Sequence, residues 1–158
     1  LQLTQFLPKD FGGKDMDTAI LAPAAVLVIW SLIMLLWMAG TRFPAMAKAG
    51  SDLSKSPPGG RGSDLEGVIP DKVNWKSHNY THLMEQPTLF YATVVILALT
   101  NAGHGLNLNL AWAYVVIRII HSIWQATVNL VNVRFFLFIA STVCLLIMAI
   151  NALWVTLF

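Results

Sequence analysis

Four long apolar runs alternate along the chain with shorter polar segments. A helix that spans a hydrocarbon core of about 30 Å needs about 20 largely apolar residues. Two of the runs meet this need without any charged residue, and the other two meet it only when polar residues are counted within them. The pattern predicts membrane-spanning helices over residues 18–40, 75–102, 108–129 and 135–158. We therefore expect an all-α, integral membrane four-helix bundle that forms a single domain over residues 1–158.

The longest polar segment is the connection between the first two runs, residues 41–74. It contains Pro57-Pro58-Gly59-Gly60, a sequence that interrupts any helix, so we expect a solvated loop. Its Gly-Gly-Arg-Gly stretch, residues 59–62, lacks the Lys-Ser/Thr pair of a phosphate-binding loop. Nucleotide binding by this loop is therefore not favoured.

The composition agrees with a membrane protein. Hydrophobic residues make up 56% of the 158 residues and charged residues only 11%, whereas soluble domains carry about 25% charged residues. The net charge of +2 is too small to indicate a nucleic-acid partner, and the principal partner is the lipid bilayer. A single cysteine, Cys144, excludes an internal disulfide and a cysteine metal motif.

Lysine and arginine residues predict how the protein is oriented, because cytoplasmic segments carry an excess of them. Seven lysine and arginine residues lie on the side of the bundle that carries the first connection and the last turn. The other side has two, Lys9 and Lys14. The seven are Arg42, Lys48, Lys55, Arg61, Lys72, Lys76 and Arg134. We expect the long loop in the cytoplasm and both termini on the other side. The compact connections favour a bacterial inner membrane.

Two oppositely charged side chains lie deep in the second and third spans. Glu85 follows Trp75 by ten positions and Arg118 follows Leu108 by ten, so each lies about 15 Å from its helix start. A charged group at this depth is costly and marks a functional site by default. A structural ion pair that joins two antiparallel helices is the other interpretation of Glu85 and Arg118.

Further polar residues extend these positions into stripes on both helices. A polar stripe at helical spacing predicts a shared face, and two such faces predict a water-accessible cavity open to the cytoplasm. Hydrogen bonding between packed helices is the alternative. The stripes are His78, His82 and Glu85 on the second span, and Arg118, His121, Gln125, Asn129 and Asn132 on the third.

A metal or haem ligand for this cavity is weakly indicated. His78, His82 and Glu85 share a spacing that can supply metal ligands from one helical face. Di-metal bundles repeat Glu-x-x-His on two helices, and this chain does not, so we assign no metal site. Haem between His82 and His121 would depend on two isolated histidines.

The same residues carry a family resemblance. Glu85-Gln86-Pro87-Thr88-Leu89-Phe90-Tyr91, followed by Arg118-Ile119-Ile120-His121-Ser122 and then Arg134, resembles the MAPEG family, the membrane-associated proteins in eicosanoid and glutathione metabolism. The order of motifs looks like the bacterial branch. Four spans with a long loop after the first agree with that family over nearly the whole chain.

The resemblance implies a homotrimer that holds glutathione between neighbouring subunits near the cytoplasmic face. It also implies a transferase or peroxidase activity on a hydrophobic small-molecule substrate. By position, Glu85, His121 and Arg134 match residues that line the glutathione pocket, and Arg118 matches the arginine of the third-helix motif. Arg42 lies where the family has an arginine that activates the thiolate, a catalytic role that Arg134 would share. A nearby guanidinium favours the thiolate, which is the attacking species.

Three positions of the chain depart from the family pattern. His78 replaces an arginine, His82 an asparagine and Gln125 a tyrosine, so three of the expected glutathione contacts are changed. The changes motivate an alternative: a non-catalytic MAPEG scaffold that binds lipid or a partner membrane complex. A small proton-coupled transporter is a third interpretation, but the first and fourth spans lack any ionisable residue and no inverted repeat is evident.

Overall fold

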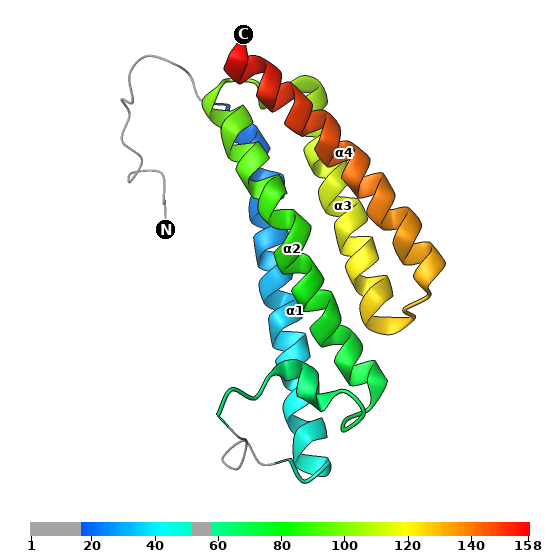
Figure 1. Ribbon diagram of the computed structural model, residues 1–158. Coiled ribbons are helices and arrows are strands. Elements are labelled where there is room, and N and C mark those ends of the chain that lie inside the picture. The colour runs from blue at the N-terminus through cyan, green and yellow to red at the C-terminus, as the bar shows by residue number, and fades with distance from the viewer. Residues whose placement is uncertain (1–16, 52–57) are drawn as a thin grey trace, which may run out of the picture.

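The computed structural model describes residues 17–51 and 58–158, and within these ranges the chain is helical and forms no strand. Each of its four long helices is long and apolar enough to cross a membrane (Figure 1). The predicted all-α, four-helix membrane fold is confirmed. The long helices are α1 (Leu21–Lys48), α2 (Asp71–Leu99), α3 (Gly105–Thr127) and α4 (Val131–Leu157), and the short 3₁₀ helices are η2 (Thr18–Ile20) and η4 (Gly62–Leu65).

The four long helices run alternately in opposite directions (Figure 1). α3 packs most extensively against α4 and α1 against α2, while contacts between α2 and α3 join the two pairs. The start of α1, the α2–α3 turn and the C-terminus lie at one end of the bundle. The helix η4 and the α3–α4 turn lie at the opposite end, which we call the loop end.

The helices extend beyond the apolar runs at the loop end. α1 continues past Gly40 to Lys48, and α2 begins at Asp71 rather than near Trp75. Hydropathy marks the part of a helix that fits the hydrocarbon layer, whereas the backbone hydrogen bonds can continue into the headgroup region. The non-helical connection is therefore shorter than residues 41–74, and Arg42 lies inside α1 rather than at its end.

The middle of the bundle has an apolar core. Phe90 of α2 and Tyr114 of α3 are fully buried, and their rings stack with centroids 4.3 Å apart. Most other large apolar side chains point outward, as Phe136 does with 71% of its surface exposed. Such a surface is stable only where lipid surrounds it, because water would penalise an apolar area of this extent.

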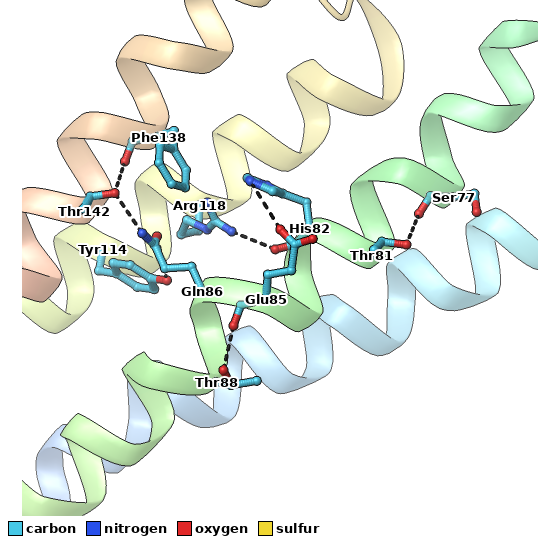
Figure 2. A network of polar contacts seen from close by, with 10 residues as sticks. All are labelled: Ser77, Thr81, His82, Glu85, Gln86, Thr88, Tyr114, Arg118, Phe138 and Thr142. Carbon is cyan, nitrogen blue, oxygen red and sulfur yellow. Dashed lines mark hydrogen bonds and ion pairs between the residues drawn. The ribbon is translucent and has the colours of Figure 1, made fainter. Parts of the chain in front are cut away.

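Hydrogen bonds between side chains join the helices within the apolar layer. Gln86 donates from Nε2 to Thr142 Oγ1 at 2.8 Å and accepts at Oε1 from the Tyr114 hydroxyl at 3.3 Å (Figure 2). Asn151 donates from Nδ2 to Asn107 Oδ1 at 2.8 Å. Polar groups in a membrane are satisfied in this way by neighbouring helices, and the bonds tie α2, α3 and α4 into one unit.

The segment before α1 is held against the α2–α3 turn at the end opposite the loop end. Asp17 accepts at Oδ2 a contact of 3.0 Å from His104 Nδ1, and its backbone N–H donates to the Ala98 carbonyl at 3.3 Å. A Cβ added at Gly103 would lie 2.6 Å from Ile20 Cγ2 and 3.2 Å from the Asp17 backbone oxygen. The absence of a side chain at Gly103 therefore permits this close approach.

We expect Gly103→Ala to lower the free energy of unfolding by about 1–3 kcal/mol, the usual cost of overpacking. The measurement is thermal unfolding of the purified protein in detergent. Gly40→Ala is the matched control, because a Cβ at Gly40 meets nothing within 4 Å and alanine suits a helix better than glycine. Equal stability of the two variants would contradict the packing seen at Gly103.

Candidate functional site

A cavity of about 200 Å³ opens between α2, α3 and α4 in the loop-end half of the bundle. It brings together three of the residues that the sequence marks as binding residues: His82, His121 and Arg134. The rest of its wall is apolar. The complete lining is His82, His121, Val131, Arg134, Phe135 and Phe138.

The two imidazoles of the cavity lie face to face. The ring centroids of His82 and His121 are 5.0 Å apart with their planes inclined by 31°, and His82 also packs on Phe138 at 5.5 Å. His121 is buried, whereas His82 is half-buried. The Nδ1 atom of His82 has no hydrogen-bond partner among the residues that the structure describes. His82 therefore places a buried nitrogen atom without a partner at the wall of the cavity.

Arg134 is held in place by the turn between α3 and α4. Asn129 lies two residues after the end of α3 in the left-handed conformation, with φ of 59°, which asparagine adopts more readily than most residues. Its side-chain oxygen accepts a hydrogen bond of 2.7 Å from Arg134 Nη1. The guanidinium is thereby aimed at the cavity rather than into solvent, and its Nε has no partner within the described ranges.

Arg118 lies behind the cavity wall and is fully buried. Its Nη2 donates to the His82 carbonyl at 3.1 Å, and its guanidinium lies 5.9 Å from the centre of the Phe138 ring. Figure 2 shows Arg118 beside Phe138, with the guanidinium extending toward His82. Its Nε and Nη1 atoms are buried and find no partner among residues 17–51 and 58–158.

The expected direct ion pair between Glu85 and Arg118 is not formed within the described chain. The nearest basic group to the Glu85 carboxylate is His82, whose Nε2 lies 4.0 Å away, and 61% of the Glu85 side chain is exposed. Arg118 is level with the His82 backbone, whereas Glu85 comes nearly one turn later on α2, and its carboxylate extends toward the His82 side chain (Figure 2). The sequence separation gives the depth of both residues but not the face on which each lies.

The middle of the third-span stripe joins helices instead of lining the cavity. Ser122 is buried and accepts hydrogen bonds from Trp30 Nε1 at 3.0 Å and from Asn79 Nδ2 at 2.8 Å. Gln125 is also buried, but it does not line the cavity, and Asn132 is exposed. His121 of the stripe thus lines the cavity, whereas Ser122 beside it forms a contact between helices.

Arg42 and His78 belong to a second polar cluster at the loop end. Arg42 donates from Nη1 to Ser77 Oγ at 2.9 Å and from Nη2 to the Gly62 carbonyl. His78 Nε2 lies 3.0 Å from the Glu66 carboxylate. These contacts connect η4 and the residue that follows it to α1 and α2. A separate polar cavity of about 290 Å³ lies between this segment and α2. Neither Arg42 nor His78 lines the cavity of His82, His121 and Arg134.

We expect His78→Ala to loosen the attachment of residues 62–66 without unfolding the bundle. An exposed ion pair is worth about 1 kcal/mol at most, so amide hydrogen exchange in this segment should rise less than about fivefold. Hydrogen–deuterium exchange with mass spectrometry measures it. His104→Ala removes a similar contact at the opposite end and should leave residues 62–66 unchanged. Unaltered exchange in His78→Ala would show that the Glu66 contact does not hold the segment.

Comparison with known proteins identifies the fold family. The model of the MAPEG family matches residues 20–154, which includes all four long helices up to near the end of α4. The chain belongs to the MAPEG family. The resemblance expected from the motifs is confirmed. Comparisons with curated proteins and with solved structures give no match.

Two features of this MAPEG protein were not identified from its sequence. Phe138 forms the back of the cavity, and Asn79, fully buried, donates to Ser122. The place of Phe138 could have been predicted from the sequence, because it follows Arg134 by one helical turn on α4 and therefore lies on the same face. Asn79 also gave a signal, because it precedes His82 of the predicted stripe by three residues and is therefore its neighbour on α2.

The cavity of this MAPEG protein is chemically suited to an anionic ligand. Of the residues that the structure describes, one guanidinium and two imidazoles form its polar lining, and no acidic side chain lines it. The acid Glu85 lies just outside, beside His82. Glutathione has two carboxylates and an ammonium group, so it needs several donors and one acid. The described residues hold no cluster of three or more His, Cys, Asp or Glu side chains, so a metal site has no geometric support in them.

Proposed function

We propose that this MAPEG protein binds glutathione in the cavity of His82, His121 and Arg134 and joins its thiolate sulfur to lipophilic electrophiles. One observation supports the proposal above others. Around the cavity, His82 Nδ1, Arg118 Nε and Nη1, and Arg134 Nε have no hydrogen-bond partner in the described chain. Buried unpaired polar groups are costly, and a ligand with carboxylate oxygens would satisfy those that it reaches.

In this proposal the charge of each residue determines which part of glutathione it binds. The Arg134 guanidinium stabilises the glutathione thiolate, whose parent thiol ordinarily has a pKa of about 8.5. His82 and His121 donate to a carboxylate, and Glu85 accepts from the ammonium group. In conjugation the thiolate sulfur forms a bond to the electrophilic carbon, and the leaving group departs with its electron pair. In the peroxidase reaction two glutathiones are oxidised to the disulfide while the hydroperoxide is reduced to alcohol and water.

The electrophile reaches the thiol from the bilayer in this proposal. Val131 and Phe135 line the cavity and are at the same time exposed on the outer face of α4. α4 is one of the helices apolar enough to cross the membrane. An apolar substrate dissolved in lipid can therefore pass between these side chains, while glutathione enters from the water at the loop end.

The proposal includes a homotrimer with its long loop in the cytoplasm. α2 carries an exposed polar strip of His78, Thr81, Glu85 and Thr88, although this helix is predicted to cross the membrane. A carboxylate facing lipid is unfavourable by several kcal/mol, so a neighbouring copy that covers the strip would remove this cost. In such an assembly, a neighbour's Arg42 and His78 could also face the ligand.

The test is glutathione binding by the purified protein at millimolar concentration, followed by conjugation of a lipophilic electrophile in proteoliposomes. We expect a saturable rise in unfolding temperature, because a ligand that binds only the folded state stabilises it. S-methylglutathione is the control, since it can bind but cannot attack. Absence of any glutathione-dependent shift at millimolar concentration would refute the proposal.

A non-catalytic scaffold is the second candidate, and the loop-end contacts favour it. Arg42 and His78, two residues at positions where the family binds glutathione, are engaged by Ser77, Gly62 and Glu66 in this chain. Such a protein would bind lipid or a partner membrane complex through its outer faces. Stoichiometric co-purification of one membrane complex under mild extraction, with no glutathione shift, would support it. Isolation as a lone oligomer would count against it.

A further inference from the structure

The most unusual group in the bundle is the Arg118 guanidinium. Arginine carries five N–H donors, yet the only hydrogen bond that Arg118 makes in the described chain is the one from Nη2 to the His82 carbonyl. The side chain is fully buried, and its Nε and Nη1 have no partner there. A buried charge without compensation is strongly unfavourable. Arg118 therefore calls for an acceptor that residues 17–51 and 58–158 do not provide.

No carboxylate of the described residues takes this place. Glu85, the nearest candidate on α2, makes its contact with His82 and is exposed for 61% of its side chain. The Tyr114 hydroxyl, one turn before Arg118 on α3, donates to Gln86, and the Phe138 ring of α4 has no acceptor oxygen. The missing acceptor would therefore come from outside the described chain.

Arg118 contacts two of the residues that line the cavity. Phe138 and His82 both line the cavity, and both contact Arg118 on their other side, through the ring at 5.9 Å and the carbonyl at 3.1 Å. A phenylalanine side chain has two rotatable single bonds, and the cavity of about 200 Å³ lies beside the Phe138 ring. A rotation of this ring would connect the guanidinium with the cavity.

We propose that Arg118 is an inner carboxylate-binding subsite of the cavity, which a ligand reaches when the Phe138 ring turns aside. A planar carboxylate matches the paired donors of a guanidinium and adds charge-assisted hydrogen bonds. Arg134 and the imidazoles hold the outer part of the ligand, and Val131 and Phe135 receive its apolar part. The inference rests on the proposed function only in assigning this cavity to a ligand.

A carboxylate could come from either of two sources. The first is the glycine end of glutathione, which arrives from water, and the second is an anionic amphiphile dissolved in the bilayer. Two pairs of probes separate the sources: glutathione with its glycine ethyl ester, and dodecanoate with dodecanol. Each pair differs in one carboxylate. Apparent Kd values are measured by calorimetry and thermal shift on the full chain in nanodiscs of zwitterionic lipid.

We expect the acid of at least one pair to bind about tenfold more tightly than its neutral counterpart, the usual value of a charge-assisted hydrogen bond. Phe138→Leu should increase this preference, because a smaller side chain exposes Arg118. Phe136→Leu is the matched control, since Phe136 lies on the same helix, is exposed and does not line the cavity. Arg118→Gln should abolish the preference, and Arg118→Lys should retain part of it.

The outcomes separate this subsite from the outer site. Equal binding of acid and neutral probe in both pairs, in the native protein and in Phe138→Leu, would overturn the inference. An acid preference that persists in folded Arg118→Gln would also overturn it, by assigning the carboxylate to Arg134. Should Arg118→Gln fail to fold, the comparison of Phe138→Leu with Phe136→Leu decides. Dodecanoate binding that depends on Arg118, without any glutathione binding, would support the subsite and refute the proposed function.

Discussion

Arg134→Ala is expected to weaken glutathione binding about 30-fold to 5,000-fold. Arg134 supplies the one guanidinium that lines the cavity among the described residues, and removing one partner of a buried charge pair costs about 2–5 kcal/mol. Because the same group would stabilise the thiolate, conjugation at saturating glutathione should fall as well. Titration calorimetry gives the Kd, and the conjugation rate in proteoliposomes, measured between pH 6 and 9, gives the thiolate effect.

Two companion variants show whether the loss comes from the guanidinium itself. Arg134→Lys keeps the charge but not the paired donors, so its affinity should be intermediate. Asn129→Gly keeps the left-handed backbone and removes the 2.7 Å bond to Arg134, so it should raise the Kd only severalfold. If Arg134→Ala folds and binds glutathione as the native protein does, the cavity is not the glutathione site.

Phe90→Ala is expected to be the most destabilising single change in the core, by about 3 kcal/mol, the lower end for a buried aromatic residue. The ring is fully buried and stacks on Tyr114 at 4.3 Å, so its removal leaves a cavity where α2 and α3 meet. In a membrane the loss comes chiefly from packing, since lipid is as apolar as the core.

Reversible unfolding in mixed micelles of mild detergent and sodium dodecyl sulfate measures the loss. Leu89→Ala is the matched control, because Leu89 is the adjacent residue and 63% exposed. It should change the free energy of unfolding by less than about 0.5 kcal/mol, as surface substitutions usually do. Similar losses in the two variants would mean that the stacked pair contributes nothing specific.

The fold could be predicted from the sequence because one constraint dominates it. A membrane leaves backbone groups no partner except those within a helix, so four apolar runs of sufficient length indicate four helices. The ends were less predictable: α1 continues to Lys48 although its apolar run ends at Gly40. The thickness of the lipid layer determines the length of the apolar run. The end of the helix depends instead on capping and on the residues that follow.

The site could be predicted only in part, because spacing along one helix does not determine what faces it on another. His82, His121 and Arg134 meet at one cavity, as their positions on neighbouring spans suggested. His78 and Arg42 belong to a different cluster, since Glu66 and Gly62 of the long loop engage them. A loop without periodicity gives no indication of its contacts.

Val131 and Phe135 are exposed both to the cavity and on the outer face of α4, and this determines how the proposed conjugation should be measured. An electrophile that enters between these two side chains comes from the lipid phase. The rate of conjugation would therefore depend on the mole fraction of electrophile in the lipid. Adding empty vesicles at constant total electrophile would then slow turnover, because the electrophile is diluted within a larger area of membrane. The concentration of glutathione in the water stays the same. In the proposed reaction the bilayer would act as the reservoir for one reactant, and a hydrophobic product would return to it.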